Sequence, residues 1–218
     1  MRIVLLGPPG SGKGTQAVTL ADELGVPHIA TGDLFRAEMS SASELGQLAQ
    51  SFIAHGNLVP DNIVNEMMRK RLQARDAAGF VLDGYPRTLP QAAALEEMLN
   101  GLQRPIGAAI NIEVPDEKIV ERAVGRIVCP ECNAVYHLVS KPPRQMGICD
   151  LCRTPLIVRS DDQPSTVRHR LSVYARITQP VLTFYEERGI LQRIAGIGTR
   201  EEVGARVREA LRRETGLC

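Results

Sequence analysis

Short apolar runs alternate along this chain with longer amphipathic stretches. Runs rich in Ile, Val, Leu and Ala that end at Gly, Pro or Asp predict short buried strands; they span 3–6, 28–30, 80–82, 108–114 and 191–194. Apolar residues at helical spacing predict helices between these strands, at 13–24, 61–74, 88–99, 116–125 and 201–213. The alternation predicts an α/β fold, in which helices flank a parallel sheet.

Two segments interrupt this alternation. Gly and Pro divide 31–60 into what we expect to be two short helices, too small to have a core of their own. The stretch 126–162 holds four cysteines and few apolar residues. Helical periodicity returns at 163–188, with a break or kink expected at Pro180. The resulting division is a core of 1–30, 60–125 and 163–218, with insertions at 31–59 and 126–162.

The turn at 7–15 carries the strongest chemical signal. Its sequence, Gly-Pro-Pro-Gly-Ser-Gly-Lys-Gly-Thr, lies between a predicted strand and a predicted helix, the context of a phosphate-binding loop. Glycines let backbone N–H groups surround phosphate oxygens, and the helix N-terminus adds a positive dipole. Lys13 adds a full charge at the β and γ oxygens. Gly14 follows the lysine, so the hydroxyl that usually contacts magnesium comes one position late, at Thr15.

A second motif, Asp-Gly-Tyr-Pro-Arg-Thr at 83–88, follows a predicted buried strand. The carboxyl ends of parallel strands face the ligand crevice of an open sheet. Asp83 could therefore hold magnesium through water, and Arg87 could bind a phosphate bidentately. The alternative is a strand end capped by a surface turn.

Four more arginines are candidates because of their spacing. Arg122 and Arg126 share one helix face, and Arg159 and Arg170 flank an acidic pair, Asp161-Asp162. Taken singly, such arginines are more often solvated or weakly paired. Taken together they suit phosphoryl transfer between nucleotides, which needs fixed cations and in-line positioning more than a general base.

Composition limits the class of protein. The 218 residues include 26 Lys+Arg against 25 Asp+Glu, for a net charge of +1, whereas a general nucleic-acid binder shows a basic excess. No apolar run reaches the length of a membrane helix, and the N-terminus does not resemble a signal peptide. We therefore expect a cytosolic protein, where paired cysteines favour metal or redox chemistry over disulfides.

The clustered cysteines have the spacing of a zinc site. Two C-x₂-C pairs are separated by sixteen residues, formed by Cys129, Cys132, Cys149 and Cys152. Four thiolates complete a tetrahedron with no open position, so the zinc would be structural and would stabilise a segment that lacks a core. Free thiols or one disulfide are the alternatives. Cys218 is expected to be a spare thiol.

Together these motifs resemble those of the adenylate kinase family, of the bacterial type with a long, zinc-bearing lid. The resemblance also rests on Thr-Gly-Asp-Leu-Phe-Arg at 31–36, Val-Gly-Arg at 124–126 and Asp-Asp-Gln…Arg-His-Arg-Leu at 161–171, and it covers nearly the whole chain in order. It implies transfer of the ATP γ-phosphoryl group to AMP, with magnesium on ATP and ADP as product. It also implies that 31–59 binds AMP, that 126–162 is a lid, and that the protein is a monomer.

The resemblance assigns residues to each nucleotide and to the transfer. Those implied on the ATP side are Gly10, Ser11, Gly12, Lys13, Gly14, Thr15, Arg122, Arg126, Val135, Tyr136, Gly198 and Arg200. Those implied on the AMP side are Thr31, Arg36, Asn57, Leu58, Val59, Gly84, Tyr85, Arg87, Gln91, Arg159 and Arg170. The implied catalytic cations are Lys13, Arg87, Arg126, Arg159 and Arg170.

Three positions depart from the family's pattern. Asn57 stands where some relatives carry a lysine. Zinc-bearing relatives usually have Gly after each cysteine pair, whereas this chain has Asn133 and Arg153. Asn tolerates a left-handed backbone and Arg does so poorly, so we expect the second pair to be looser or to turn differently.

Two other functions remain compatible with parts of the sequence. One is a kinase for another nucleoside monophosphate, such as UMP or CMP, although Thr31 with Gln91 resembles the AMP-selective pattern. The other is a zinc-ribbon nucleic-acid-binding ATPase. The near-zero charge, the 4% aromatic content and the lack of a basic run beside the cysteines argue against it.

Overall fold

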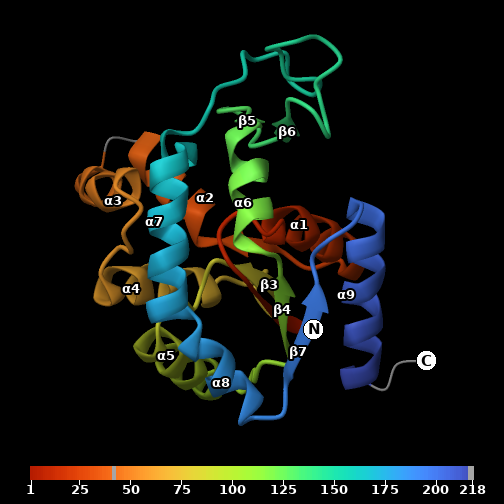
Figure 1. The fold of residues 1–218 in the computed structure, drawn as a ribbon. Helices are drawn as coiled ribbons and strands as arrows, with labels where there is room; N and C mark the ends of the chain where they lie inside the picture. Colours follow the sequence, from red (N-terminus) through yellow and green to blue (C-terminus); the bar gives the residue numbers. More distant parts are fainter. Residues whose placement is uncertain (41–42, 216–218) are drawn as a thin grey trace.

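The computed structural model describes residues 1–40 and 43–215 of the chain. Its centre is a five-stranded sheet in which every neighbouring pair is parallel (Figure 1). The spatial order is β2-β3-β1-β4-β7. The strands are β1 (Arg2–Leu6), β2 (His28–Ala30), β3 (Phe80–Asp83), β4 (Ala108–Glu113) and β7 (Leu191–Ala195).

Helices cover both faces of the sheet because successive strand residues point to opposite sides. Ile3 and Leu5 of β1 pack on the face covered by α1 (Lys13–Leu24), α6 (Asp116–Val124), α7 (Pro164–Val173) and α9 (Arg200–Thr215). Val4 and Leu6 pack on the other face, against α2 (Thr31–Ser40), α3 (Glu44–Ala54), α4 (Asp61–Leu72), α5 (Leu89–Gly101) and α8 (Pro180–Glu186). No helix in the described ranges has the length and apolar composition of a membrane span.

The predicted strands and helices are confirmed, with bounds that differ by two residues or fewer. The segment 31–60 contains two helices as expected, α2 and α3. The long helical stretch does break near Pro180, but through a π-helical segment, η2 (Tyr174–Thr178), that the sequence did not predict. There the N–H of Gln179 bonds to the carbonyl of Tyr174, five residues back, at 2.8 Å.

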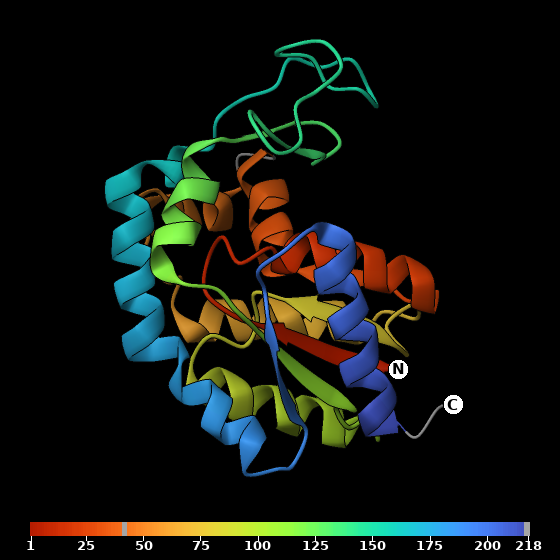
Figure 2. The same cartoon turned by 45° about the vertical axis from the view of Figure 1, so that its right-hand side comes forward.

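The segment 126–162 contains two strands that its irregular pattern did not reveal. β5 (Arg126–Val128) and β6 (Val135–His137) pair antiparallel, and a 3-10 turn, η1 (Ser160–Asp162), leads into α7. Their own small cluster contains Ile127, Cys129, Tyr136 and Cys149. This part of the chain projects away from the sheet at the top of the molecule (Figure 2).

Candidate functional site

The phosphate-binding loop lies between β1 and α1, where close backbone approach requires glycine. A Cβ on Gly7 would lie 2.6 Å from the carbonyl oxygen of Ile112. Gly12 caps α1 with a left-handed backbone (φ 93), and no atom lies within 4 Å of a Cβ built there. The loop therefore packs tightly against β4 on one side and leaves the N-terminus of α1 open to a ligand.

Lys13 begins α1 and folds back over the loop. Its Nζ donates to the carbonyls of Gly7 and Pro8, both at 2.7 Å. Burial lowers the pKa of Lys13 to about 8; the charge of Asp83 opposes this shift, and that of Arg87 reinforces it. Beside it, the buried Oγ of Ser11 has no hydrogen-bond partner among the described residues. A phosphate group would supply both the missing acceptor and the counter-charge.

Asp83 ends β3 beside the loop, as expected from the topology. A Cβ on Gly14 would lie 3.2 Å from Asp83 Oδ2. A serine or threonine at this position would therefore press its side chain against the carboxylate, which gives a physical reason for the glycine. His28 lies on the other side, with Nε2 4.0 Å from Asp83 Oδ2.

Two of the predicted arginines are paired with the acidic residues of η1. Arg126 forms a two-pronged ion pair with Asp162, with Nε 2.7 Å from Oδ2, and the Asp162 side chain is fully buried. Burial would lower the pKa of Arg126, but the hydrogen bonds and charge of Asp162 raise it. Arg170 Nη1 lies 2.5 Å from Asp161 Oδ2. The sequence showed this acidic pair but not its partners, because the pairing joins segments that only the fold brings together.

The remaining cations repel one another in a half-buried position. Burial, reinforced by the charge of Arg170, lowers the pKa of Arg87. Burial also lowers the pKa of Arg159 to about 10, reinforced by Arg36 and Arg126. The buried Nε atoms of Arg36 and Arg159 have no hydrogen-bond partner among the described residues. An anionic ligand would accept hydrogen bonds from these unsatisfied donors and would offset the repulsion among the cations. The cluster therefore favours the binding of an anion.

On the predicted AMP side, three residues meet around one carbonyl. Thr31 Oγ1 and Arg87 Nε donate to the carbonyl oxygen of Gly84 at 2.9 and 2.7 Å. Gly84 has a left-handed backbone (φ 79), and a Cβ there would lie 2.9 Å from both side chains. The structure thus brings Thr31, Gly84 and Arg87 together, as the motifs indicated.

Gln91 also belongs to this group, and it is held in place by Asp61, which the sequence analysis did not single out. Its Oε1 accepts from the backbone N–H of Arg87 at 2.7 Å, and its Nε2 donates to Asp61 Oδ1 at 2.8 Å. Asp61 also accepts from Thr88 Oγ1 at 2.7 Å. Acidic residues are common at the first turn of a helix, so nothing in the sequence distinguished Asp61, at the start of α4, as a support for the site.

Some predicted residues direct their side chains away from the cations. Tyr85 is buried, and its hydroxyl donates to Asn65 Oδ1 at 2.8 Å. Tyr136 is buried in the cysteine-bearing segment, and its hydroxyl accepts from the N–H of Asp150 at 2.8 Å. Val59 is also buried. A nucleotide contact at these positions would use the backbone.

The other predicted positions lie at the edges of the site. Asn57 bonds His169, with Oδ1 2.9 Å from Nε2, and Leu58 is half-buried beside it. Arg122 donates to the carbonyl of Gly196 at 3.1 Å, and Arg200 donates to Thr19 Oγ1 at 2.6 Å.

In the loop, Gly10 is half-buried and Thr15 is exposed, and Val135 of β6 is half-buried. Gly198 lies in the turn between β7 and α9.

The four predicted metal ligands converge. Their Sγ atoms all lie within 4.8 Å of one another, with Cys129 3.3 Å from Cys152 and Cys132 3.5 Å from Cys149. Edges of about 3.8 Å are expected for four sulfurs around zinc, whereas a disulfide requires about 2.05 Å. All four are free thiols. The donor set therefore fits a tetrahedral metal, and Cys218 lies outside the described residues.

The two cysteine pairs turn in the same way, so the expected difference between them is wrong. Asn133 and Arg153 both have left-handed backbones, with φ of 57 and 66. Each N–H bonds to the first cysteine of its pair, at 3.1 Å to Cys129 and 3.0 Å to Cys149. The geometry of these turns requires the left-handed conformation, and Arg153 adopts it despite the steric cost of its Cβ.

Comparisons with known proteins agree with one another. The sequence model of the family described as adenylate kinase matches residues 5–190. The adenylate kinase of Symbiobacterium thermophilum is 53% identical over 97% of this chain and 99% of its own. That of Streptomyces avermitilis is 49% identical and covers 98% of both chains. That of Anaeromyxobacter sp. (strain K) is 47% identical over 98% of this chain and 100% of its own.

Proposed function

This chain belongs to the adenylate kinase family, and we propose which of its residues perform the family's reaction. That reaction is the reversible transfer of the ATP γ-phosphoryl group to AMP to give two ADP. The attacking oxygen of AMP is already anionic, so the transfer requires alignment and charge stabilisation rather than a general base. We assign the charge stabilisation to five cations, Lys13, Arg87, Arg126, Arg159 and Arg170.

The two nucleotides would occupy opposite sides of this cation cluster. The ATP side comprises the loop at 10–15, with Arg122, Arg126, Val135, Tyr136, Gly198 and Arg200. The AMP side comprises Thr31, Arg36, Asn57, Leu58, Val59, Gly84, Tyr85, Arg87, Gln91, Arg159 and Arg170. Adenylate kinases use magnesium with ATP, and Asp83 would hold that ion through water, where it would neutralise phosphate charge.

The domain division follows from the same assignment. Residues 1–30, 60–125 and 163–218 form the core, 31–59 the AMP-binding insertion and 126–162 the lid. Closure of the two insertions over the bound nucleotides would exclude water and align the phosphates. The ion pairs of Arg126 and Arg170 with η1 support this division, because they join the base of the lid to the cation cluster.

The lid would be stabilised by a structural zinc ion on Cys129, Cys132, Cys149 and Cys152. The proposal is supported by the mutual distances of the four sulfurs and by the matched turns of the two pairs. Zinc bound by four thiolates has no open position for a substrate, so it would contribute to folding rather than to chemistry.

We further propose that the protein acts in the cytoplasm as a monomer, with nucleotides rather than nucleic acid or membranes as partners. The nearly balanced charge supports this. A molar mass in solution close to 23.8 kDa would agree with a monomer.

The observation that carries the residue assignment is the convergence of a half-buried lysine and several half-buried arginines, some with unsatisfied donors, on one phosphate-binding loop. The test is a coupled assay for ADP formed from Mg-ATP with AMP, CMP, UMP or GMP as acceptor. We expect a strong preference for AMP, and production of ATP and AMP from ADP alone. Lack of interconversion with AMP, or a preference for a pyrimidine acceptor, would contradict the proposal.

A further inference from the structure

The side chain of Tyr136 reaches from β6 to the second cysteine pair. Its hydroxyl oxygen lies 3.5 Å from Cys149 Sγ and accepts a hydrogen bond from the N–H of Asp150 at 2.8 Å. Asp150 in turn accepts from the N–H of Arg144 through Oδ1, at 2.9 Å. A single hydroxyl therefore contacts a predicted metal ligand and the residue that follows this ligand in the chain.

The direction of the two hydroxyl bonds follows from the protons available. A tyrosine hydroxyl carries one proton and can also accept a hydrogen bond. Because Asp150 donates its N–H to the oxygen of Tyr136, the hydroxyl proton is left for Cys149 Sγ. A thiolate that binds a metal has no proton and can only accept. The hydroxyl is therefore the donor in the metal-bound form.

Burial makes this contact hard to replace with water. Tyr136 has 4% of its surface exposed and Cys149 has 0%, and both belong to the small apolar cluster of the segment 126–162. Another hydroxyl oxygen, Oγ1 of Thr154, lies 3.3 Å from Cys152 Sγ. Cys152 is exposed, so water can supply a hydrogen bond there. The buried sulfur of Cys149 depends on Tyr136 instead.

We propose that Tyr136 is a positioning residue for the cysteine ligands, with its hydroxyl proton donated to the Cys149 thiolate and its oxygen holding the backbone of Asp150. The two bonds tie the second cysteine pair to β6, the strand whose backbone we assign to the ATP side. Outer hydrogen bonds of this kind orient metal ligands and increase metal affinity. The inference rests on the proposed zinc site, because it assumes a metal on the four thiolates.

The test compares Tyr136→Phe with the wild type. Phe keeps the ring and its packing but removes the hydroxyl. The dissociation constant for zinc, measured by competition with a chelator of known affinity, should rise about tenfold. With cobalt(II) in the site, the sulfur-to-metal charge-transfer band should move to longer wavelength, because a thiolate that loses a hydrogen bond gives up its electrons more readily.

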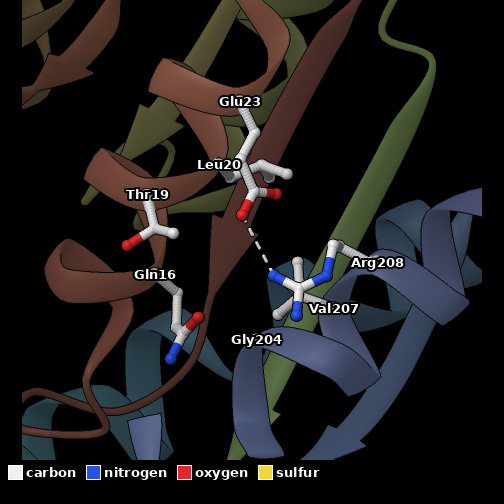
Figure 3. A pocket seen from close by; sticks show the side chains of 7 residues that line it. All are labelled: Gln16, Thr19, Leu20, Glu23, Gly204, Val207 and Arg208. Atoms are coloured by element: carbon white, nitrogen blue, oxygen red, sulfur yellow. Dashed lines mark hydrogen bonds and ion pairs between the residues drawn. The ribbon is translucent and has the colours of Figure 1, made fainter. Parts of the chain in front are cut away.

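Two control variants separate this effect from a general loss of stability. Tyr185→Phe makes the same chemical change at a buried tyrosine of α8, whose hydroxyl has no hydrogen-bond partner among the described residues. Glu23→Gln breaks the ion pair with Arg208 at 3.1 Å, across the seam between α1 and α9 (Figure 3). Between the same helices, Gln16 Nε2 donates to the carbonyl of Arg200 at 3.0 Å, so the helices stay linked in this variant. Both controls should bind zinc as the wild type does.

A measurement on the wild type decides the case even if Tyr136→Phe folds poorly. With the NMR-active isotope of cadmium in place of zinc, the metal should show a scalar coupling to the Tyr136 hydroxyl proton, transmitted through the hydrogen bond to Cys149 Sγ. Unchanged zinc affinity in folded Tyr136→Phe, the lack of this coupling, or equal weakening in Tyr185→Phe would overturn the inference and leave the proposed zinc site intact. A wild-type chain that binds neither zinc nor cadmium would instead contradict the proposed zinc site.

Discussion

Lys13 carries its charge where burial disfavours it. The charge is held by two carbonyl oxygens and by the field of Asp83, while three neighbouring arginines repel it. Such a lysine is costly to the free protein, yet it is well placed to bind phosphate oxygens. The residue therefore shows a conflict between stability and function that mutation can separate.

Replacing Lys13 with Met should stabilise the protein and abolish its turnover. Because the pKa is lowered from 10.5 to about 8, the unfolded chain binds more protons than the folded one between these pH values. Wild-type stability therefore rises with pH through this window. The Met variant should be more stable by about 3 kcal/mol at pH 7, and the difference should disappear near pH 10.5.

Turnover of the same variant should fall by roughly 10³-fold or more, because a cation at the transferred phosphate is lost. Denaturant unfolding at several pH values and the coupled assay measure the two effects. Lys13→Arg, which keeps the charge, is the control and should show no stabilisation at pH 7. A Met variant that is less stable than wild type at pH 7 would show that burial of the charge is not the dominant cost.

At the scale of elements, the segment 126–162, the proposed lid, has little core of its own. β5 and β6 have three residues each, and the lid cluster contains two of the four cysteines as core residues. A segment with so little apolar area to bury requires another source of stability. The matched cysteine turns provide one if a metal joins them.

Removal of the metal should therefore loosen the lid before it affects the chemistry. The purified protein is expected to contain about one zinc per chain, and Cys149→Ser should lose it. Limited proteolysis should then cut within 126–162, while turnover at low temperature remains substantial. Cys218→Ser is the control and should retain zinc. Complete loss of turnover with the lid still protected from protease would contradict a purely structural role.

At the scale of the whole molecule, the proposed AMP-binding insertion and α7 touch beside the cation cluster. Asn57 and His169 are 112 positions apart in sequence and share a hydrogen bond at 2.9 Å. A Cβ on the preceding Gly56 would lie 2.9 Å from Cγ of Arg170. The proposed closure of the insertion would thereby be linked to the helix that carries Arg170.

Breaking this link should weaken AMP binding slightly. His169→Ala removes an exposed hydrogen bond, so the KM for AMP should rise about two- to threefold, with the KM for ATP unchanged. Arg168→Ala, at the neighbouring exposed position of α7, is the matched control. Steady-state kinetics with each nucleotide varied in turn gives the result. An equal change in both KM values would indicate a general disturbance of α7 instead of a link to the insertion.

The elements that could be predicted are those specified by local patterns. The strands, most helices, the phosphate-binding loop and the two cysteine pairs each depend on residues within a few positions of one another. The π-helical turn before Pro180 and the strands β5 and β6 were not predicted. The two strands are too short to show a clear periodicity, and the π-helical turn depends on tertiary contacts that leave no periodic pattern. The left-handed Arg153 was misjudged because the turn overrides the preference of a single residue.

The sequence alone determined the alternation of strand and helix, the loop that begins at Gly7, and the identity of the cations, since these depend on residue type and spacing. The tertiary structure decided which carboxylate pairs with Arg126 and Arg170, that Asp61 supports Gln91, and that Gln16 reaches Arg200. These contacts join segments far apart in the chain. Their partners are selected by the distances and burial that exist only after the sheet and its helices have assembled.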